Sequence, residues 1–223
     1  MPPRSALPPP PPPLEIRAWP DRDALLADRS HLLGVLVKAH IGPGRLGLLW
    51  LWGAVGALGW SLIGTALIAF EEAYDPFSAI FGLVMLALGA AVLIPAAVLI
   101  GAGVRRDVAV RRLLTQWGEL DRDPARDAGL RLPGVSLVWL LTSFVLAALG
   151  LFACVVVPAG AVRGEDTYGL MALVMGLGLL AWIVGLVGVF KAFWHRRWIV
   201  RTVTGTAAPD PLPAWGGGGG THR

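Results

Sequence analysis

The amino-acid sequence predicts an all-α integral membrane protein: a bundle of four transmembrane helices, paired as two helical hairpins, with an N-terminal interfacial amphipathic helix. Three observations predict this fold. Four long segments contain no charged side chain. Hydrophobic residues make up 55% of the chain and charged residues only 15%, which is typical of membrane proteins rather than soluble domains. The basic residues lie almost entirely on one side of the predicted membrane.

The uncharged segments define a transmembrane domain over residues 46–190, with spans at about 46–70, 77–104, 135–157 and 168–190. At about 1.5 Å per residue, the first span forms a helix of about 37 Å, enough to cross a hydrocarbon core of about 30 Å with some tilt. Pro95 predicts a kink in the second span because it has no amide donor, and Pro158 interrupts the third. Short links within each pair of spans predict the two hairpins.

The segment at residues 21–41 precedes the first span and predicts an amphipathic helix. Leucine and valine recur at spacings of seven and four, which places them on one helical face. Asp23 is the predicted N-cap, and the Gly42-Pro43-Gly44 triplet ends the helix. We expect this helix to lie in the membrane interface; packing under the bundle or on a partner is the alternative.

Both ends of the chain predict disordered tails. Residues 1–20 contain nine prolines, which favour an extended polyproline II conformation. Residues 203–223 are rich in glycine and proline and include five consecutive glycines, which indicates a flexible segment.

The loop at residues 105–134 carries a cluster of basic side chains. It begins as an amphipathic continuation of the second span, marked by Val110, Leu114 and Trp117. Its arginines lie where anionic headgroups would be, each contributing about 1 kcal/mol of attraction. We expect the lipid surface or a partner protein to contact Arg105, Arg106, Arg111 and Arg112. Nucleic acid is not an expected partner, because five acidic residues share the loop and no nucleic-acid-binding module surrounds it.

The distribution of basic residues predicts the orientation. Eighteen of the 19 arginines and lysines lie before the first span, in the loop at 105–134 or after the last span, and only Arg163 lies on the other side. The positive-inside rule therefore places both termini in the cytoplasm of a multi-pass protein of the cell membrane.

Small side chains recur every fourth residue along the first span and predict a helix-packing stripe at Gly53, Ala57, Ser61 and Thr65. Small residues let helix backbones approach closely in a bilayer, where lipid tails are as apolar as leucine. Packing within the bundle is the first interpretation of this stripe, and a self-association face is the alternative. Hydroxyl groups in the first and third spans are expected to add interhelical hydrogen bonds, from Ser61, Thr65, Thr142 and Ser143.

The sequence offers no recognisable catalytic, cofactor or metal site, so we do not expect an enzyme. The spans contain no ionisable residue, the usual mark of proton relays and ion paths. The single cysteine, Cys154, excludes an intramolecular disulfide. The histidines His31, His40 and His195 are expected to be interfacial side chains. Five carboxylates on the short links are expected to be solvated caps, with divalent-cation binding as the alternative: Glu71, Glu72, Asp75, Glu165 and Asp166.

Two functional hypotheses follow from these patterns. The first is a non-catalytic scaffold, accessory or interaction protein, whose partner is a membrane protein or a second copy. The second is an oligomeric transporter or channel component for an uncharged solute. The missing intramembrane charge favours the first.

Replacing Ala57 with a bulky residue should disturb folding or association, because this side chain lies in the middle of the small-residue stripe. Thermal unfolding and the molar mass of the purified particle test the prediction. It is wrong if both stay unchanged.

Overall fold

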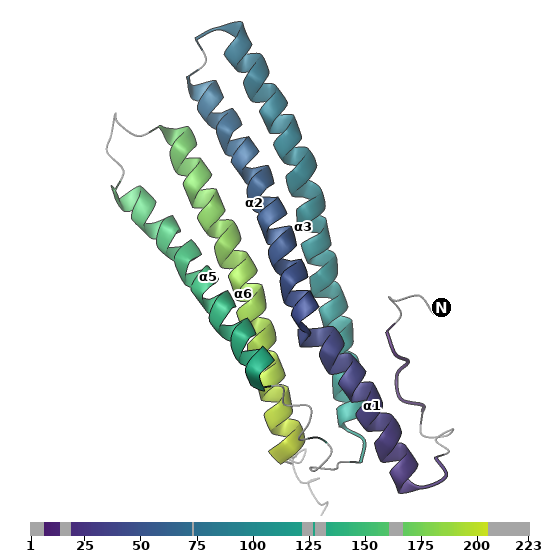
Figure 1. Cartoon of the computed structure of the whole chain (residues 1–223). Coiled ribbons are helices and arrows are strands. Elements are labelled where there is room, and N and C mark those ends of the chain that lie inside the picture. Colours follow the sequence, from purple (N-terminus) through teal and green to yellow (C-terminus); the bar gives the residue numbers. More distant parts are fainter. Residues whose placement is uncertain are drawn as a thin grey trace, which may run out of the picture.

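The computed structural model describes residues 7–13, 19–72, 74–121, 127, 133–160 and 167–204, and it contains no strand within these ranges (Figure 1). Four helical segments in the described part are long and apolar enough to cross a membrane. The all-α class and the four apolar spans are therefore confirmed. The expected tail at 203–223 lies almost entirely outside the described residues, as do residues 1–6, 14–18, Glu165 and Asp166.

The helices are α1 (Arg22–Ile41), α2 (Pro43–Glu71), α3 (Pro76–Gly118), α5 (Pro133–Gly160) and α6 (Tyr168–Thr204). Pro158 does not end α5, which continues through Gly160. Both α3 and α6 extend well beyond their apolar stretches, to Gly118 and Thr204. These extensions lie beside α1 at one end of the molecule, which we call the α1 end (Figure 1). The opposite end, with the start of α3 and of α6, is the link end.

Side-chain caps fix where α1 and α3 begin. The Asp21 carboxylate accepts a hydrogen bond from the Ala24 amide at 2.7 Å and caps α1, so the prediction of Asp23 as N-cap is wrong. Asp23 lies in the first turn instead, where the helix dipole favours a negative charge. Asp75 caps α3 in the same way, by accepting from the Ser78 amide at 3.3 Å.

The four long helices lie in an open row in the order α5, α6, α2, α3 (Figure 1). Each helix packs against its neighbour in this order, whereas α3 and α5, at the two edges, form no interface in the described residues. A closed four-helix bundle would join these two edges. The row therefore leaves one flank of α3 and one flank of α5 uncovered by the residues that the structure describes.

Glycines set the closest approaches within the row. A Cβ atom on Gly59 of α2 would lie 2.7 Å from the Leu93 amide nitrogen of α3, and one on Gly89 would lie 2.7 Å from the Gly59 carbonyl oxygen. In α5, a Cβ atom on Gly150 would lie 2.5 Å from the Gly178 carbonyl oxygen of α6. Backbone-to-backbone contact at this range requires residues without a side chain.

The stripe predicted in the first span is only partly covered. Gly53 and Ala57 are half-buried beside α6, and Thr65 is exposed. The hydroxyl groups of Ser61 and Thr65 donate within their own helix, to the carbonyl groups four residues earlier at 2.9 Å, and Thr142 does the same at 2.6 Å. The expected interhelical hydrogen bonds from these three hydroxyls are therefore wrong, because a carbonyl in the preceding turn is the nearer acceptor.

A hydrophobic core lies at the α1 end. It joins α1 to the extensions of α3 and α6, and it consists of Leu33, Leu36, Val37, Ile41, Val110, Leu114, Trp117, Leu120, Trp139, Ala192, Trp198 and Ile199. The leucine and valine side chains of α1 thus pack against α3 and α6. Packing under the bundle was the alternative to the expectation that this helix lies free in the membrane interface. Along the spans, by contrast, most large apolar side chains point outward.

Gly59→Ala should lower the free energy of unfolding by about 1–3 kcal/mol, because the added methyl group must push α2 and α3 apart. Gly47→Ala in the same helix is the matched control, since a Cβ atom there meets nothing within 4 Å. Detergent-induced unfolding followed by loss of helicity measures both variants. Coincident unfolding curves would contradict the proposed contact.

Candidate functional site

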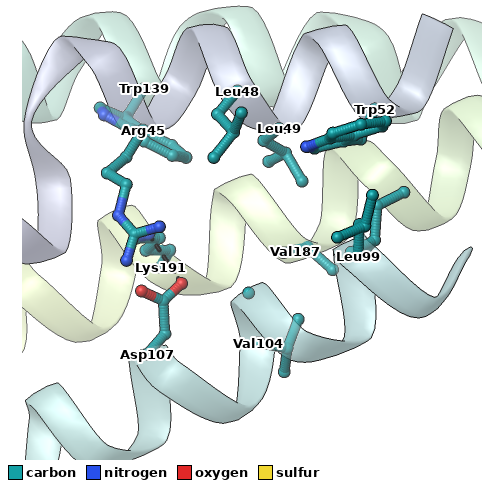
Figure 2. Close-up of a pocket in the computed structure, with 12 residues that line it drawn as sticks. Arg45, Leu48, Leu49, Trp52, Leu99, Val104, Asp107, Trp139, Val187 and Lys191 are labelled. Carbon is teal, nitrogen blue, oxygen red and sulfur yellow. Dashed lines mark hydrogen bonds and ion pairs between the residues drawn. The ribbon is translucent and has the colours of Figure 1, made fainter. Parts of the chain in front are cut away.

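One polar cluster gathers a side chain from every helix at the α1 end. We call it the polar cluster and define it by His40 of α1, Arg45 of α2, Asp107 of α3, Trp139 of α5 and Lys191 of α6. Figure 2 shows the last four of these side chains converging beside an apolar cavity. Side chains from five helices meet here because the extensions of α3 and α6 carry the charged residues past the spans.

A buried ion pair forms the centre of the polar cluster. Lys191 Nζ lies 2.7 Å from Asp107 Oδ2, and the two residues are only 7% and 8% exposed. The ammonium also lies 5.0 Å from the centroid of the Trp139 ring, within reach of a cation–π interaction. The second carboxylate oxygen, Oδ1, is 3.9 Å from Nδ1 of His40. Each charge is removed from water, so each depends on the other for compensation.

Two arginines bring further positive charge to the same place. Arg45 donates from Nε to the Ala39 carbonyl at 3.2 Å, and its guanidinium points toward the Asp107 carboxylate (Figure 2). Arg111 donates from Nε to the Asp107 carbonyl at 3.3 Å. Its guanidinium carbon lies 5.2 Å from the centroid of the Phe190 ring. Three cations therefore surround a single carboxylate.

Aromatic rings and a second histidine cover the polar cluster. His40 meets Trp194 edge-on at 5.3 Å between centroids, and its ring lies 6.4 Å from that of His195. Both histidines are fully buried, so the prediction that they are interfacial is wrong. Each lies on the buried face of its helix, and His31, on the other face of α1, is exposed.

A second buried ion pair lies at the α1 end, between Arg29 and Asp127. Arg29 binds both carboxylate oxygens of Asp127, at 2.6 and 3.1 Å, and donates from Nε to the Trp117 carbonyl at 3.1 Å. Both side chains of the pair are 1% exposed. The Trp117 indole in turn donates to the Pro9 carbonyl at 3.2 Å. The bidentate pair holds α1 to Asp127, which lies between α3 and α5 in the chain, and the hydrogen bond to the Trp117 carbonyl adds a contact with α3.

The predicted arginine site divides into two parts. Arg105 and Arg112 are exposed, whereas Arg106 and Arg111 are half-buried. Of the four, Arg111 lies beside the polar cluster and lines a cavity of about 270 Å³ between α3 and α6. Contact of these arginines with headgroups or a partner stays a prediction.

The carboxylates at the link end have separate structural tasks. Glu71 accepts hydrogen bonds from the amides of Tyr168 and Gly169, at 3.0 and 2.7 Å, and so caps α6. Hydrogen bonds from the side chain and amide of Ser78 lower the pKa of Asp75. No group of three His, Cys, Asp or Glu side chains suited to a metal ion occurs among residues that the structure describes.

Sequence reasoning missed the polar cluster, although a signal exists. Asp107 precedes Val110 and Leu114 by three and seven residues, so it belongs to the apolar face of α3 rather than to the charged one. A charged residue on an apolar face needs a buried partner.

Asp107→Asn should destabilise the protein by about 3–5 kcal/mol, because it leaves the buried Lys191 ammonium without a counter-charge. Adding Lys191→Met should restore most of the loss. Asp121→Asn is the matched control: its ion pair with Arg22 is exposed, with side chains 41% and 69% accessible, and should contribute at most about 1 kcal/mol. Equal unfolding midpoints for Asp107→Asn and Asp121→Asn in detergent would contradict the assignment.

Comparison with known protein families, curated proteins and solved structures gives no match for this chain.

Proposed function

We propose that the protein is a multi-pass protein of the cell membrane that acts as a non-catalytic scaffold or accessory component. Its partner is another membrane protein or a second copy of the chain, held against the uncovered flanks of α3 and α5. The open row of spans carries this proposal, because two helices at the edges of the row lack the neighbours that a closed bundle provides.

The flanks of the row have the surface that helix association needs. Large apolar side chains project from both edge helices: Ile94 and Val98 of α3 are each 62% exposed, and Phe144 and Phe152 of α5 are 61% and 64% exposed. In a bilayer, helices associate through van der Waals packing of such side chains rather than through the hydrophobic effect. A partner helix along either flank would extend the row or close it.

The charges of the α1 end support its placement in the cytoplasm with both termini. Arg105 and Arg112 of α3 are exposed there, as are three arginines of α6, namely Arg196, Arg197 and Arg201. Exposed arginines next to apolar spans favour the cytoplasmic leaflet and its anionic lipids. The spans then insert as two hairpins, α2 with α3 and α5 with α6, and α1 lies at the level of the interface against the bundle.

The polar cluster suits a structural role better than a catalytic one. Asp107 and Lys191 neutralise each other at 2.7 Å, and His40 lies under the aromatic rings of α6. Catalytic groups need access to a substrate, whereas His40 is fully buried and Asp107 and Lys191 nearly so. We propose no enzymatic activity and no nucleic-acid partner.

A groove on one face of the row supports the transporter alternative. It has a volume of about 230 Å³, and its lining combines α2, α5 and α6 through Trp50, Gly53, Ala54, Ala57, Leu146, Leu177, Leu180, Ala181 and Val184. An apolar groove of this size suits an uncharged solute. Transport of a solute would also require a continuous path across the membrane. Oligomerisation of the chain would have to complete that path.

Purification in a mild detergent from native membranes, with molar mass and mass spectrometry, tests the scaffold proposal. We expect a particle heavier than one 23.6 kDa chain, containing a second copy or a stoichiometric partner. In a Cys154→Ala background, cysteines at Ile94 and Phe152 on the flanks should cross-link to that partner. A cysteine at Leu58 should not, because α2 has a neighbour on both sides. A monomer without partner contradicts the proposal, and solute flux in liposomes then supports the alternative.

A further inference from the structure

The polar cluster lies at the head of a groove that runs along α3 and α6 into the spans. Two cavities that share lining residues form it, one of about 50 Å³ lined also by α2 (Figure 2) and one of about 270 Å³. Both cavities are lined by Val104, Asp107, Val187 and Lys191. The groove exists because α3 and α6 lie on either side of α2 in the row and do not close over it.

The head of the groove carries uncompensated positive charge. Lys191, Arg45 and Arg111 gather around one acidic residue, Asp107, so two positive charges are in excess. The Oδ1 atom of Asp107 is buried there too, and it has no hydrogen-bond partner among the described residues. The Nη2 atom of Arg45 is buried and has no hydrogen-bond partner among the described residues. Arg111 uses Nε for the Asp107 carbonyl, so its two Nη groups remain for an acceptor. A buried guanidinium donor without an acceptor, as in Arg45, is costly, and an anion would satisfy it.

The rest of the groove is apolar and points toward the middle of the membrane. Leu99, Gly103 and Val104 lie on the span side of Asp107 in α3, and Leu186 and Val187 lie on the span side of Lys191 in α6. Charge at one end and apolar side chains at the other match one kind of molecule, an amphiphile with an anionic head. A free anion would leave the apolar half unfilled, and a zwitterionic lipid would bring a cation beside the arginines.

We infer that this groove binds an anionic phospholipid, whose phosphate accepts hydrogen bonds from Arg111 and Arg45 and whose acyl chain lies along Val104, Leu186 and Val187. The inference rests on the proposed membrane placement but not on the proposed partner. Such binding differs from a general attraction of arginines to the bilayer surface, because one lipid occupies one defined site on each chain.

Native mass spectrometry of the delipidated full-length protein tests the site with two chain-matched probes, palmitoyl-oleoyl phosphatidylglycerol and palmitoyl-oleoyl phosphatidylcholine. We expect one phosphatidylglycerol to bind about tenfold more tightly than phosphatidylcholine, the size of effect that one charge-assisted interaction gives. Arg111→Gln should remove about that tenfold preference. Arg112→Gln, which removes the same charge from the neighbouring exposed position, should change the affinity less than about twofold.

A second variant tests the apolar half without touching the charges. A Cβ atom on Gly103 meets nothing within 4 Å, so Gly103→Leu should fold and fill the smaller cavity, which Arg45 also lines. We expect it to weaken phosphatidylglycerol binding about tenfold or more. This variant decides the question if Arg111→Gln fails to fold, which circular dichroism reports.

Three results would overturn the inference. Equal losses for Arg111→Gln and Arg112→Gln would indicate general surface attraction. Equal affinity for the two phospholipids, or unchanged binding in Gly103→Leu, would exclude this groove as an anionic lipid site. Competition by glycerol 3-phosphate at the same concentration as the lipid would identify a site for free phosphate. The partner proposal would survive each of these results, since its cross-links lie on other surfaces.

Discussion

The buried ion pair between Asp107 and Lys191 is the interaction on which the arrangement of the helices depends. It joins α3 to α6, two helices that lie on opposite sides of α2 and otherwise approach each other little. Because the charges are shielded from water, separating them is costly, and the cost rises as the surroundings become less polar. The pair therefore fixes the distance between α3 and α6 at this level, and α1 packs beside it against these two helices.

The molecule is held together by two kinds of packing. Between the spans, glycines bring backbones into contact and leave many large side chains facing lipid, because burying them brings no gain from the hydrophobic effect in a bilayer. At the α1 end, leucine, valine and tryptophan side chains form a core like that of a soluble domain. The boundary between the two is the level of Asp107 and Lys191. The charged side chains at this level lie between the lipid-facing spans and the packed core, at the depth of the phospholipid headgroups.

The sequence was sufficient to predict the all-α class and the four spans, because uncharged apolar segments of this length are typical of transmembrane helices. It was insufficient for the row, because every span presents apolar side chains all round and periodicity does not distinguish a lipid-facing side from a packed one. The polar cluster escaped prediction for a different reason. Asp107 and Lys191 lie among charged residues in the sequence, and His40 lies near the predicted interface. Their helical phase nevertheless aligns them with Val110, Trp194 and Leu36 on packed faces.

Lys191 follows Asp107 by 84 positions in the chain, which imposes an order on biosynthesis. The spans of α2 and α3 enter the membrane while the Asp107 carboxylate has only the arginines of these two helices, Arg45 and Arg111, for positive charge nearby. α1 can pack at that stage, because it lies chiefly against α3. The ion pair closes only when α6 has been synthesised, so a chain truncated before Lys191 would keep its spans but leave this carboxylate without its ammonium partner.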